Sequence, residues 1–328
     1  MTTMERQVAL FVLFNLIQNT VTVGFLPAKC STEKDVITCL NQTYITPQSF
    51  PSTMVELRLT HSAIINIQSG FLQALTRVAP NLRAIIISSS DITYMHACSF
   101  STASNLSQIL VKDSSIQEIV QNAFSDLKSV QKIEFINVRI KEISKLAFHG
   151  VQGVELFKMD KLTVTNMSYA SFAELDEVRV LQLTNSYIQL MESQAIVNLK
   201  SVSSIQITGN TFKSTLCGFN ILQPGLDFTN NNLTCNTNMT ATLSSAGNNR
   251  CLWNVKDMCP ELKDTGIVKH SYDCQTITLD EGIRPVSQDE IFDIENSEDP
   301  NNCGISNLCT FRTSFFWIIY SVLISFVA

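Results

Sequence analysis

The sequence of 328 residues has few glycines and few prolines, 11 and 8 respectively, which excludes collagen-like chains and chains dominated by linkers. Charged residues are also scarce, at 16 % against 45 % hydrophobic residues, and this excludes an intrinsically disordered chain. Basic residues are outnumbered by acidic ones, 23 against 29, so a broad basic surface for nucleic acid is missing. The composition predicts a folded protein with a sizeable core and no nucleic-acid partner.

Catalytic and metal-binding motifs are missing as well. The sequence contains no GxSxG, HExxH, P-loop or GxGxxG motif, which would mark hydrolases, metalloproteases and nucleotide-binding enzymes. It has no CxxC, and none of its four histidines has the spacing of a zinc ligand. We therefore predict a protein that is not an enzyme and holds no cofactor or metal.

The beginning of the chain has the features of a secretory signal peptide, which we assign to residues 1–24. Arg6 supplies a positive charge, and the apolar run from Val8 to Ile17 has the length of a signal h-region. The alternative is an uncleaved membrane anchor. Export fits the ten cysteines, which indicate an oxidising compartment, and the Asn-x-Ser/Thr glycosylation sequons, which begin at Asn41, Asn105, Asn166, Asn232 and Asn238.

The end of the chain has the features of a glycosylphosphatidylinositol (GPI) attachment signal. Residues 314–328 carry no charge but are shorter than the roughly 20 residues of a spanning helix. Small residues and a polar spacer precede them, as in GPI signals. We predict an acidic stalk at 275–302, lipidation at Asn302 (alternatively Ser297 or Gly304), and a propeptide at 303–328. A short transmembrane tail is the rival interpretation. With either anchor, we expect the protein to lie on the extracellular face of the cell membrane.

An internal repeat of 24 residues occupies the middle of the chain. Copies begin at Leu82, Leu106, Val130, Val154, Val178 and Val202, and a longer first copy of 28 residues begins at Met54. Apolar residues recur at fixed offsets in each copy, so a coil that completes one circuit per copy can point all of them inward. The pattern predicts stacked parallel strands, with helical return arms such as Gln121–Leu127 and Tyr169–Leu175 on the outer side.

These repeats resemble the leucine-rich repeat family over about residues 54–233. The resemblance implies an α/β solenoid of about seven repeats, with a curved parallel sheet on its concave face and short helices or loops on its convex face. It also implies disulfide caps at residues 25–53 and 234–274. The cap cysteines would be Cys30 and Cys39, then Cys235, Cys251, Cys259 and Cys274. The family's usual CxC pair is missing from the second cap, and its four cysteines permit three pairings.

The chain departs from the family at one repeated position. The family's asparagine, which bonds backbone along the coil, is present only as Asn210 and Asn231, and serines stand at Ser62, Ser90, Ser114 and Ser186. Val138 and Leu162 cannot make such bonds, so we expect irregular backbone near them. Cys98 and Cys217 lie outside the caps and are predicted to be buried reduced thiols, with an intermolecular bridge as the alternative.

The strand residues that alternate with the buried ones should form a binding surface. Ile86, Leu110 and Ile136 are predicted to give an apolar patch, and such patches bind proteins. Lys112, Glu134 and Lys158 should flank it. We therefore expect a cell-surface recognition protein that binds an extracellular protein ligand or co-receptor, in adhesion or as a co-receptor itself. The alternatives are a self-associating surface or matrix protein, which would form homodimers, and a pattern-recognition receptor.

Overall fold

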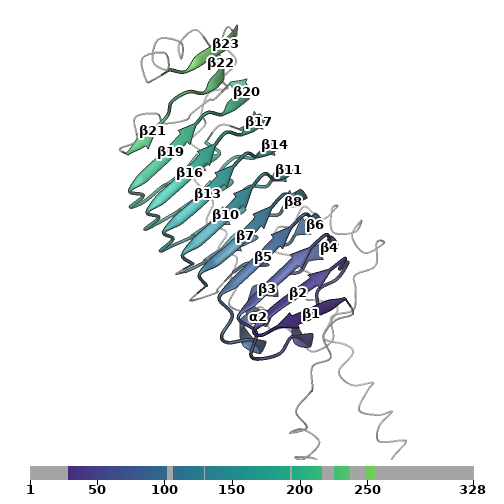
Figure 1. The fold of residues 1–328 in the computed structure, drawn as a ribbon. Helices are drawn as coiled ribbons and strands as arrows, with labels where there is room; N and C mark the ends of the chain where they lie inside the picture. The colour runs from purple at the N-terminus through teal and green to yellow at the C-terminus, as the bar shows by residue number, and fades with distance from the viewer. Residues whose placement is uncertain are drawn as a thin grey trace, which may run out of the picture. The chain divides into compact units, whose positions relative to one another are not determined.

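The computed structural model describes residues 29–101, 106–128, 130–192, 194–215, 225–236 and 248–255 (Figure 1). The chain divides into two compact units, 1–278 and 279–328, and every described residue belongs to the first. Several predictions fall outside the described residues. They are the signal peptide, the stalk with the lipidation site Asn302, the propeptide, the sequons at Asn105 and Asn238, and the cysteines Cys217, Cys259 and Cys274.

The described residues form a parallel β-solenoid of about eight turns, in which each turn adds one strand to each of two long sheets (Figure 1). Sheet A has ten strands: β1 (Cys30–Glu33), β2 (Val36–Leu40), β3 (Glu56–Thr60), β5 (Ala84–Ser88), β7 (Gln108–Lys112), β10 (Lys132–Ile136), β13 (Leu156–Asp160), β16 (Val180–Thr184), β19 (Ser204–Thr208) and β21 (Leu226–Asp227). They pair in that order, and all pairs except β1–β2 are parallel.

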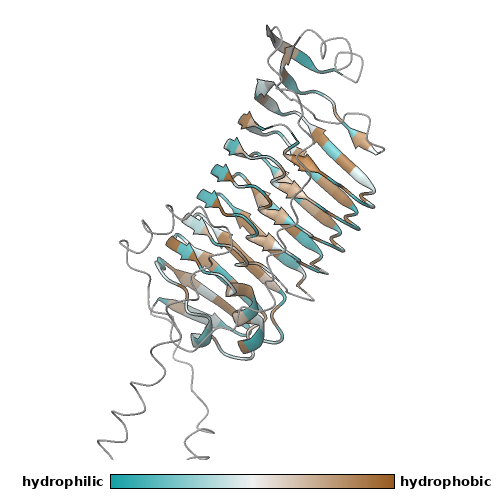
Figure 2. Ribbon diagram, turned by 180° about the vertical axis from the view of Figure 1, so that it is seen from behind, coloured by the Kyte–Doolittle hydropathy of each residue, from teal (hydrophilic) through white to brown (hydrophobic). Residues whose placement is uncertain are grey.

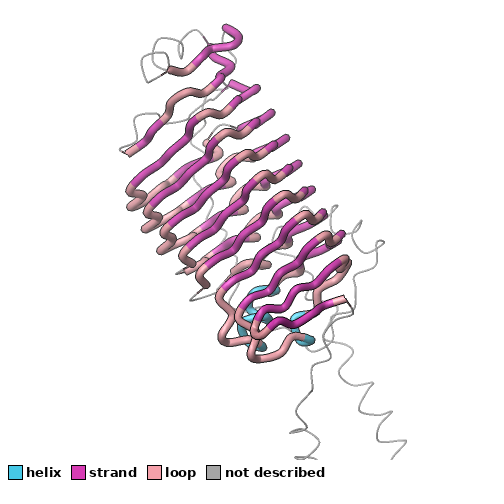
Figure 3. The backbone as a smooth tube through the Cα atoms, viewed as in Figure 1, coloured by secondary structure: helices cyan, strands magenta, loops and turns pink. Residues whose placement is uncertain are grey.

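Sheet B has nine strands: β4 (Ala63–Ile67), β6 (Asp91–Met95), β8 (Ser115–Ile119), β11 (Arg139–Ile143), β14 (Thr163–Met167), β17 (Tyr187–Met191), β20 (Thr211–Thr215), β22 (Asn232–Asn236) and β23 (Arg250–Val255). The shorter sheet C closes the coil with β9 (Phe124–Ser125), β12 (Phe148–His149), β15 (Phe172–Ala173) and β18 (Ile196–Val197). Figure 3 shows strands and connecting loops alternating around each turn.

The strand register confirms the repeat. Lys132 of β10 pairs with Gln108 on one side and with Leu156 on the other, each 24 residues away. Glu56 pairs with Ala84, 28 residues later, as the longer first copy requires. Neighbouring turns therefore place the same repeat position side by side.

The fold is mostly β, so the predicted α/β class is wrong. Only α2 (Phe71–Val78) and the short 3-10 helix η1 (Pro47–Ser49) are helical among the described residues (Figure 3), and no helix there is long and apolar enough to span a membrane. The predicted helix at Gln121–Leu127 is instead the short strand β9 between two corners, Asn122 and Asp126, whose φ angles are 59° and 52°. Left-handed residues so close together turn the chain before a helix can form.

A stack of phenylalanines fills the centre of the coil. Phe148 lies between Phe124 and Phe172, with ring centroids 4.8 Å and 4.7 Å away, and both pairs are stacked. Phe100 extends the stack, 4.7 Å from Phe124. The rings are buried, and hydrophobic residues recur along the strands of successive turns (Figure 2). One turn cannot bury its apolar side alone, so this shared interior is what joins the turns.

A ladder of polar side chains runs beside the phenylalanines at the position of the family's asparagine. Each side-chain oxygen accepts a hydrogen bond from a backbone N–H of the preceding turn. Serines do so for Gln42, Ser62, Ser90 and Leu162, and asparagines for Ser186, Asn210 and Asn231. The last acceptor is Asn249, which the repeat pattern did not identify.

The predicted irregularity at Val138 and Leu162 is wrong. Strands β10 and β13, which precede these residues, pair in full register, and the backbone bonds continue beside them, from Arg139 to Ser114 and from Thr163 to Val138, each 3.0 Å long. Both side chains are buried. Backbone pairing and apolar packing thus keep the turns regular where the side-chain ladder is interrupted.

Disulfides lie near both ends of the described coil. Cys30 joins Cys39 across the antiparallel β1–β2 pair, and Cys235 joins Cys251 between β22 and β23. The first bond is the predicted N-terminal pair, and the second is one of the three pairings left open. Cys98 is also disulfide-bonded, so the prediction that it is a reduced thiol is wrong.

Candidate binding face

The outer face of sheet A is built from every second strand residue. In β5, β7, β10, β13 and β16 the second and fourth residues are buried in the coil, while the first, third and fifth are on the outer side. Because the strands are parallel and in register, these residues form three columns that run across the turns. Apart from Ser88, the outer residues of these five strands keep some contact with solvent.

The predicted apolar patch lies in two of these columns. Ile86 and Leu110 are register partners in the central column. Ile136 is in the neighbouring column, where it pairs with Lys112 and Asp160. It therefore lies diagonal to Leu110, on the adjoining strand. All three apolar side chains are half-buried, so their outer atoms remain available for contact.

The predicted charged residues surround this patch. Glu134 separates Leu110 from Lys158 in the central column, and its carboxylate accepts a hydrogen bond of 2.6 Å from the side-chain amide of Gln108. Lys112 is exposed and Lys158 is half-buried. The arrangement is an apolar centre with cations and a carboxylate at its edge.

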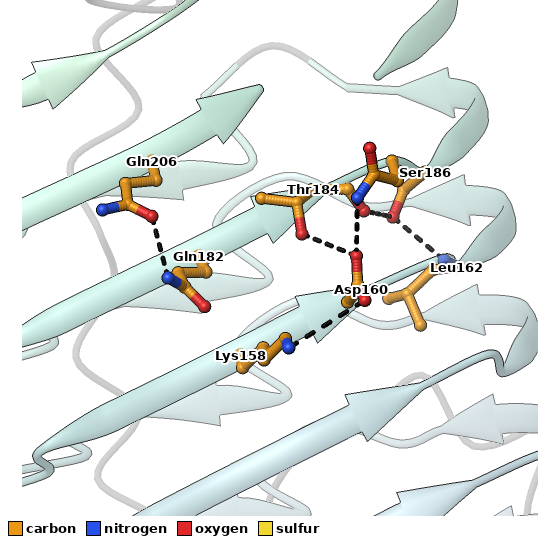
Figure 4. Close-up of polar contacts among 8 residues, drawn as sticks. Lys158, Asp160, Leu162, Gln182, Thr184, Ser186 and Gln206 are labelled. Atoms are coloured by element: carbon orange, nitrogen blue, oxygen red, sulfur yellow. Dashed lines mark hydrogen bonds and ion pairs between the residues drawn. The ribbon is translucent and has the colours of Figure 1, made fainter. Parts of the chain in front are cut away.

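Asp160 is the centre of a polar network on the same face, which the prediction did not include in the site (Figure 4). Its carboxylate accepts hydrogen bonds from Thr184 (2.8 Å) and from the amide of Asn185 (2.9 Å), and Lys158 lies 3.9 Å away. Beside it, Gln182 donates to Gln206 over 2.8 Å. All these residues except Asn185 occupy outer positions of the repeat, so their equal offsets were the available signal.

These contacts lower the pKa of Asp160. Partial burial alone would raise the pKa of the carboxyl, but the hydrogen bonds from Asn185 and Thr184 and the charges of Lys158 and Lys161 outweigh it. A carboxyl whose pKa is depressed by folding stabilises the fold above its unfolded pKa, and the contribution disappears as the pH falls through the folded pKa.

Asp160→Asn should therefore destabilise the protein most at neutral pH and least in acid. The asparagine keeps the shape of the side chain but loses the charge that Lys158 and the two donors favour. The difference in unfolding free energy between wild type and variant is measured by urea denaturation at pH 7 and pH 3. An equal difference at both pH values would contradict the assigned network.

The described sequons differ in exposure. Asn41 is exposed in the turn after β2, whereas Asn166 and Asn232 are half-buried within strands of sheet B. The side-chain amide of Asn166 lies 3.4 Å from the hydroxyl of Ser168. Among the described residues, Asn41 therefore has the most open position for a glycan.

Within the same ranges, no group of three or more His, Cys, Asp or Glu side chains is placed to hold a metal.

Comparison with protein families gives one match, to a family described as "BspA type Leucine rich repeat region". Six copies are matched, over residues 28–148 and 93–219. Together these ranges cover more than half of the chain and most of the described solenoid. The matched family is one of repeats, and no enzymatic domain is matched. No curated protein matches the chain.

Proposed function

Because the chain belongs to the BspA-type leucine-rich repeat family, we propose that it is a protein-binding repeat protein of the cell surface. The outer face of sheet A is its binding surface, and the ligand is an extracellular protein bound in adhesion or as a co-receptor. The observation that carries this proposal is the half-buried pair of Ile86 and Leu110 with its charged surroundings. Apolar centres within polar rims are typical of protein interfaces.

Replacing Ile86, Leu110 and Ile136 together by serine should weaken ligand binding by a factor of ten or more. The apolar centre of an interface supplies most of its binding energy, and a tenfold loss corresponds to only about 1.4 kcal/mol. The probe is the labelled ectodomain, residues 25–302, added to cells whose surface proteins are intact or digested with protease. Wild type should bind intact cells only.

A matched control comes from the outer side of sheet B, where Ile65, Tyr187 and Leu190 are exposed. Their replacement by serine removes similar apolar area from a different face and should leave binding unchanged. Equal loss in both triple variants, or wild-type binding that survives protease treatment, would contradict the proposed face or the proposed class of ligand.

The proposed attachment to the membrane follows from the sequence at the C-terminus. If Asn302 carries a GPI anchor, phosphatidylinositol-specific phospholipase C should release the protein from the surface of cells that express the full chain. Surface labelling before and after treatment measures the release. Retention, while a known GPI protein is released from the same cells, would mean that residues 314–328 hold the chain in the membrane themselves.

A further inference from the structure

Exposed apolar side chains gather at the first turn of the coil. Five large apolar side chains are exposed in the described ranges, and three of them, Leu40 (46 %), Tyr44 (53 %) and Ile65 (43 %), lie there. Leu40 ends β2, and Ile65 is in β4, the first strand of sheet B. The N–H of Ile65 donates over 3.4 Å to the carbonyl of Thr43, the residue before Tyr44. A terminal turn of a solenoid needs a polar outer surface, and these side chains do not supply one.

Asn41 lies in the middle of this apolar surface. It directly follows Leu40 and begins the sequon Asn-Gln-Thr, which immediately precedes Tyr44. Its backbone is fixed on the coil, because its N–H donates to the carbonyl of Thr60 over 3.3 Å and its φ angle is 49°. A glycan on Asn41 would therefore start from a fixed corner, at most about 11 Å from the Cα atom of Tyr44.

The side-chain amide of Asn41 is available for a glycan, unlike the amides of the other two described sequons. Asn166 donates to the hydroxyl of Ser168 and Asn232 to that of Thr211, each over 3.4 Å. The side chain of Asn41 is exposed and makes no hydrogen bond to a described residue. Because a glycan replaces one hydrogen of this nitrogen, its attachment at Asn41 costs the described coil no hydrogen bond.

The row of corners after sheet A explains why this amide has no acceptor. Asn137 and Asn185 occupy the equivalent corners of later turns, also with positive φ angles. Their amides donate to carboxylates one turn earlier, Asp113 over 2.8 Å and Asp160 over 2.9 Å. Asn41 follows β2, the first parallel strand of sheet A, so the described coil has no earlier corner to offer an acceptor.

We propose that Asn41 carries an N-linked glycan whose first sugars lie over Leu40 and Tyr44 and form the polar cap of the first turn. The proposal rests on the export that the proposed function requires. The C–H face of a sugar ring packs on the phenol ring of Tyr44, while the hydroxyls stay in water. Beside it, the edge strand β1 pairs with β2 alone among the described strands. The glycan therefore keeps this end from pairing with a second copy of the chain.

Glycopeptide mapping of the full chain, expressed in a eukaryotic secretory host, tests the modification. Trypsin releases residues 35–58, in which Asn41 is the only asparagine. N-glycosidase F in heavy-oxygen water should convert Asn41 to labelled aspartate. An unlabelled Asn41 in a chain that is glycosylated at another sequon would overturn this proposal alone. Absence of glycan from all five sequons would contradict export, and with it both this proposal and the proposed cell-surface function.

Hydroxyl-radical footprinting of the same chain tests the cover, with Tyr187 as the control. Without a glycan Tyr44 is the more exposed of the two, at 53 % against 37 %. In the glycosylated wild type Tyr44 should instead be oxidised roughly threefold more slowly than Tyr187. Thr43→Ala removes the sequon and should raise the rate at Tyr44 above that at Tyr187, whereas Thr43→Ser keeps the sequon and should match wild type. Equal rates at Tyr44 in the two variants would overturn the cover.

Crosslinking on the surface of expressing cells tests the role of the cap. Lys29 and Lys34 are exposed beside the two ends of β1, so an amine-reactive crosslinker reports contact between two copies at this end. Thr43→Ala should give dimers crosslinked through these lysines, which wild type lacks. Adding Leu40→Ser and Tyr44→Ser to that variant should abolish the dimers. A Thr43→Ala variant without such crosslinks would overturn the role of the glycan as a cap against self-association.

Discussion

Phe148→Ala should lower the free energy of unfolding by about 3–5 kcal/mol, the usual cost of removing a buried phenylalanine ring. The ring is 1 % exposed and stacks on Phe124 and Phe172. It also meets Phe157 edge-on, with centroids 5.2 Å apart. Alanine would leave a cavity that the rigid strands on either side cannot close. Urea denaturation of wild type and variant measures the difference.

Phe212→Ala is the comparison for this prediction. Phe212 is equally buried, but its ring has one stacked neighbour in the described coil, Phe228, at 6.4 Å. Its removal should cost measurably less than that of Phe148. If both variants lose the same amount, the stacking of rings across turns adds nothing to their burial, and the importance assigned to the row of phenylalanines is wrong.

Asn210→Ala should cost about 2–4 kcal/mol, because the unpaired N–H of Ser186 costs about 1–3 kcal/mol and the lost hydrogen bond to Leu183 adds about 1 kcal/mol. The side-chain oxygen of Asn210 accepts from the N–H of Ser186 over 2.9 Å, and its amide donates to the carbonyl of Leu183 over 2.7 Å. Asn210 is fully buried, so water cannot take over either bond. The measurement is again urea denaturation.

Asn210→Ser should restore part of this loss. A serine already serves at the equivalent position one turn earlier, where the hydroxyl of Ser186 accepts from the N–H of Leu162 over 2.9 Å. The serine variant would keep an acceptor for Ser186 but lose the donor to Leu183. A serine variant as unstable as the alanine variant would show that the bond to Leu183, and not the ladder, carries the effect.

The repeat could be predicted from the sequence because residues that pair across neighbouring strands are 24 positions apart and are buried alike. Leucine, isoleucine and phenylalanine at equal offsets became register partners, such as Ile133 and Phe157. Sheet B was not predicted, for a physical reason. In β8 the buried residues are Ile116 and Ile119, three apart, whereas a regular strand buries every second residue. The pairing of these strands skips their third residue, and this irregularity hides the strand in the sequence.

The prediction of helical return arms was wrong because the residues with positive φ that turn the chain at each corner were not recognised in the sequence. Asn122 and Gly150 are residue types that tolerate a positive φ, and both adopt one. Leu146, with the same conformation, gives no such signal. The only α-helix in the described ranges, α2, occurs in the copy that has four extra residues, about one helical turn. The extra length gave the better indication of where a helix would form.

The candidate face was predicted in part. Alternation correctly identified Ile86 and Leu110 as outward-facing neighbours. The network of Asp160, Thr184 and Asn185 depends on which side chains on adjacent strands reach each other, and a single repeat copy does not contain that information.

The strict register has a consequence for how such a protein can change in evolution. Lys132 and Leu156 occupy the same place in successive coils, so a duplication of one 24-residue unit joins in frame at any equivalent point. The new coil inherits stacking partners above and below, and both disulfide-bonded ends remain intact. Each such event lengthens the outer face by one strand, about 4.8 Å. The span of the contact surface can therefore be adjusted in fixed steps, by gene duplication, without redesign of the interior.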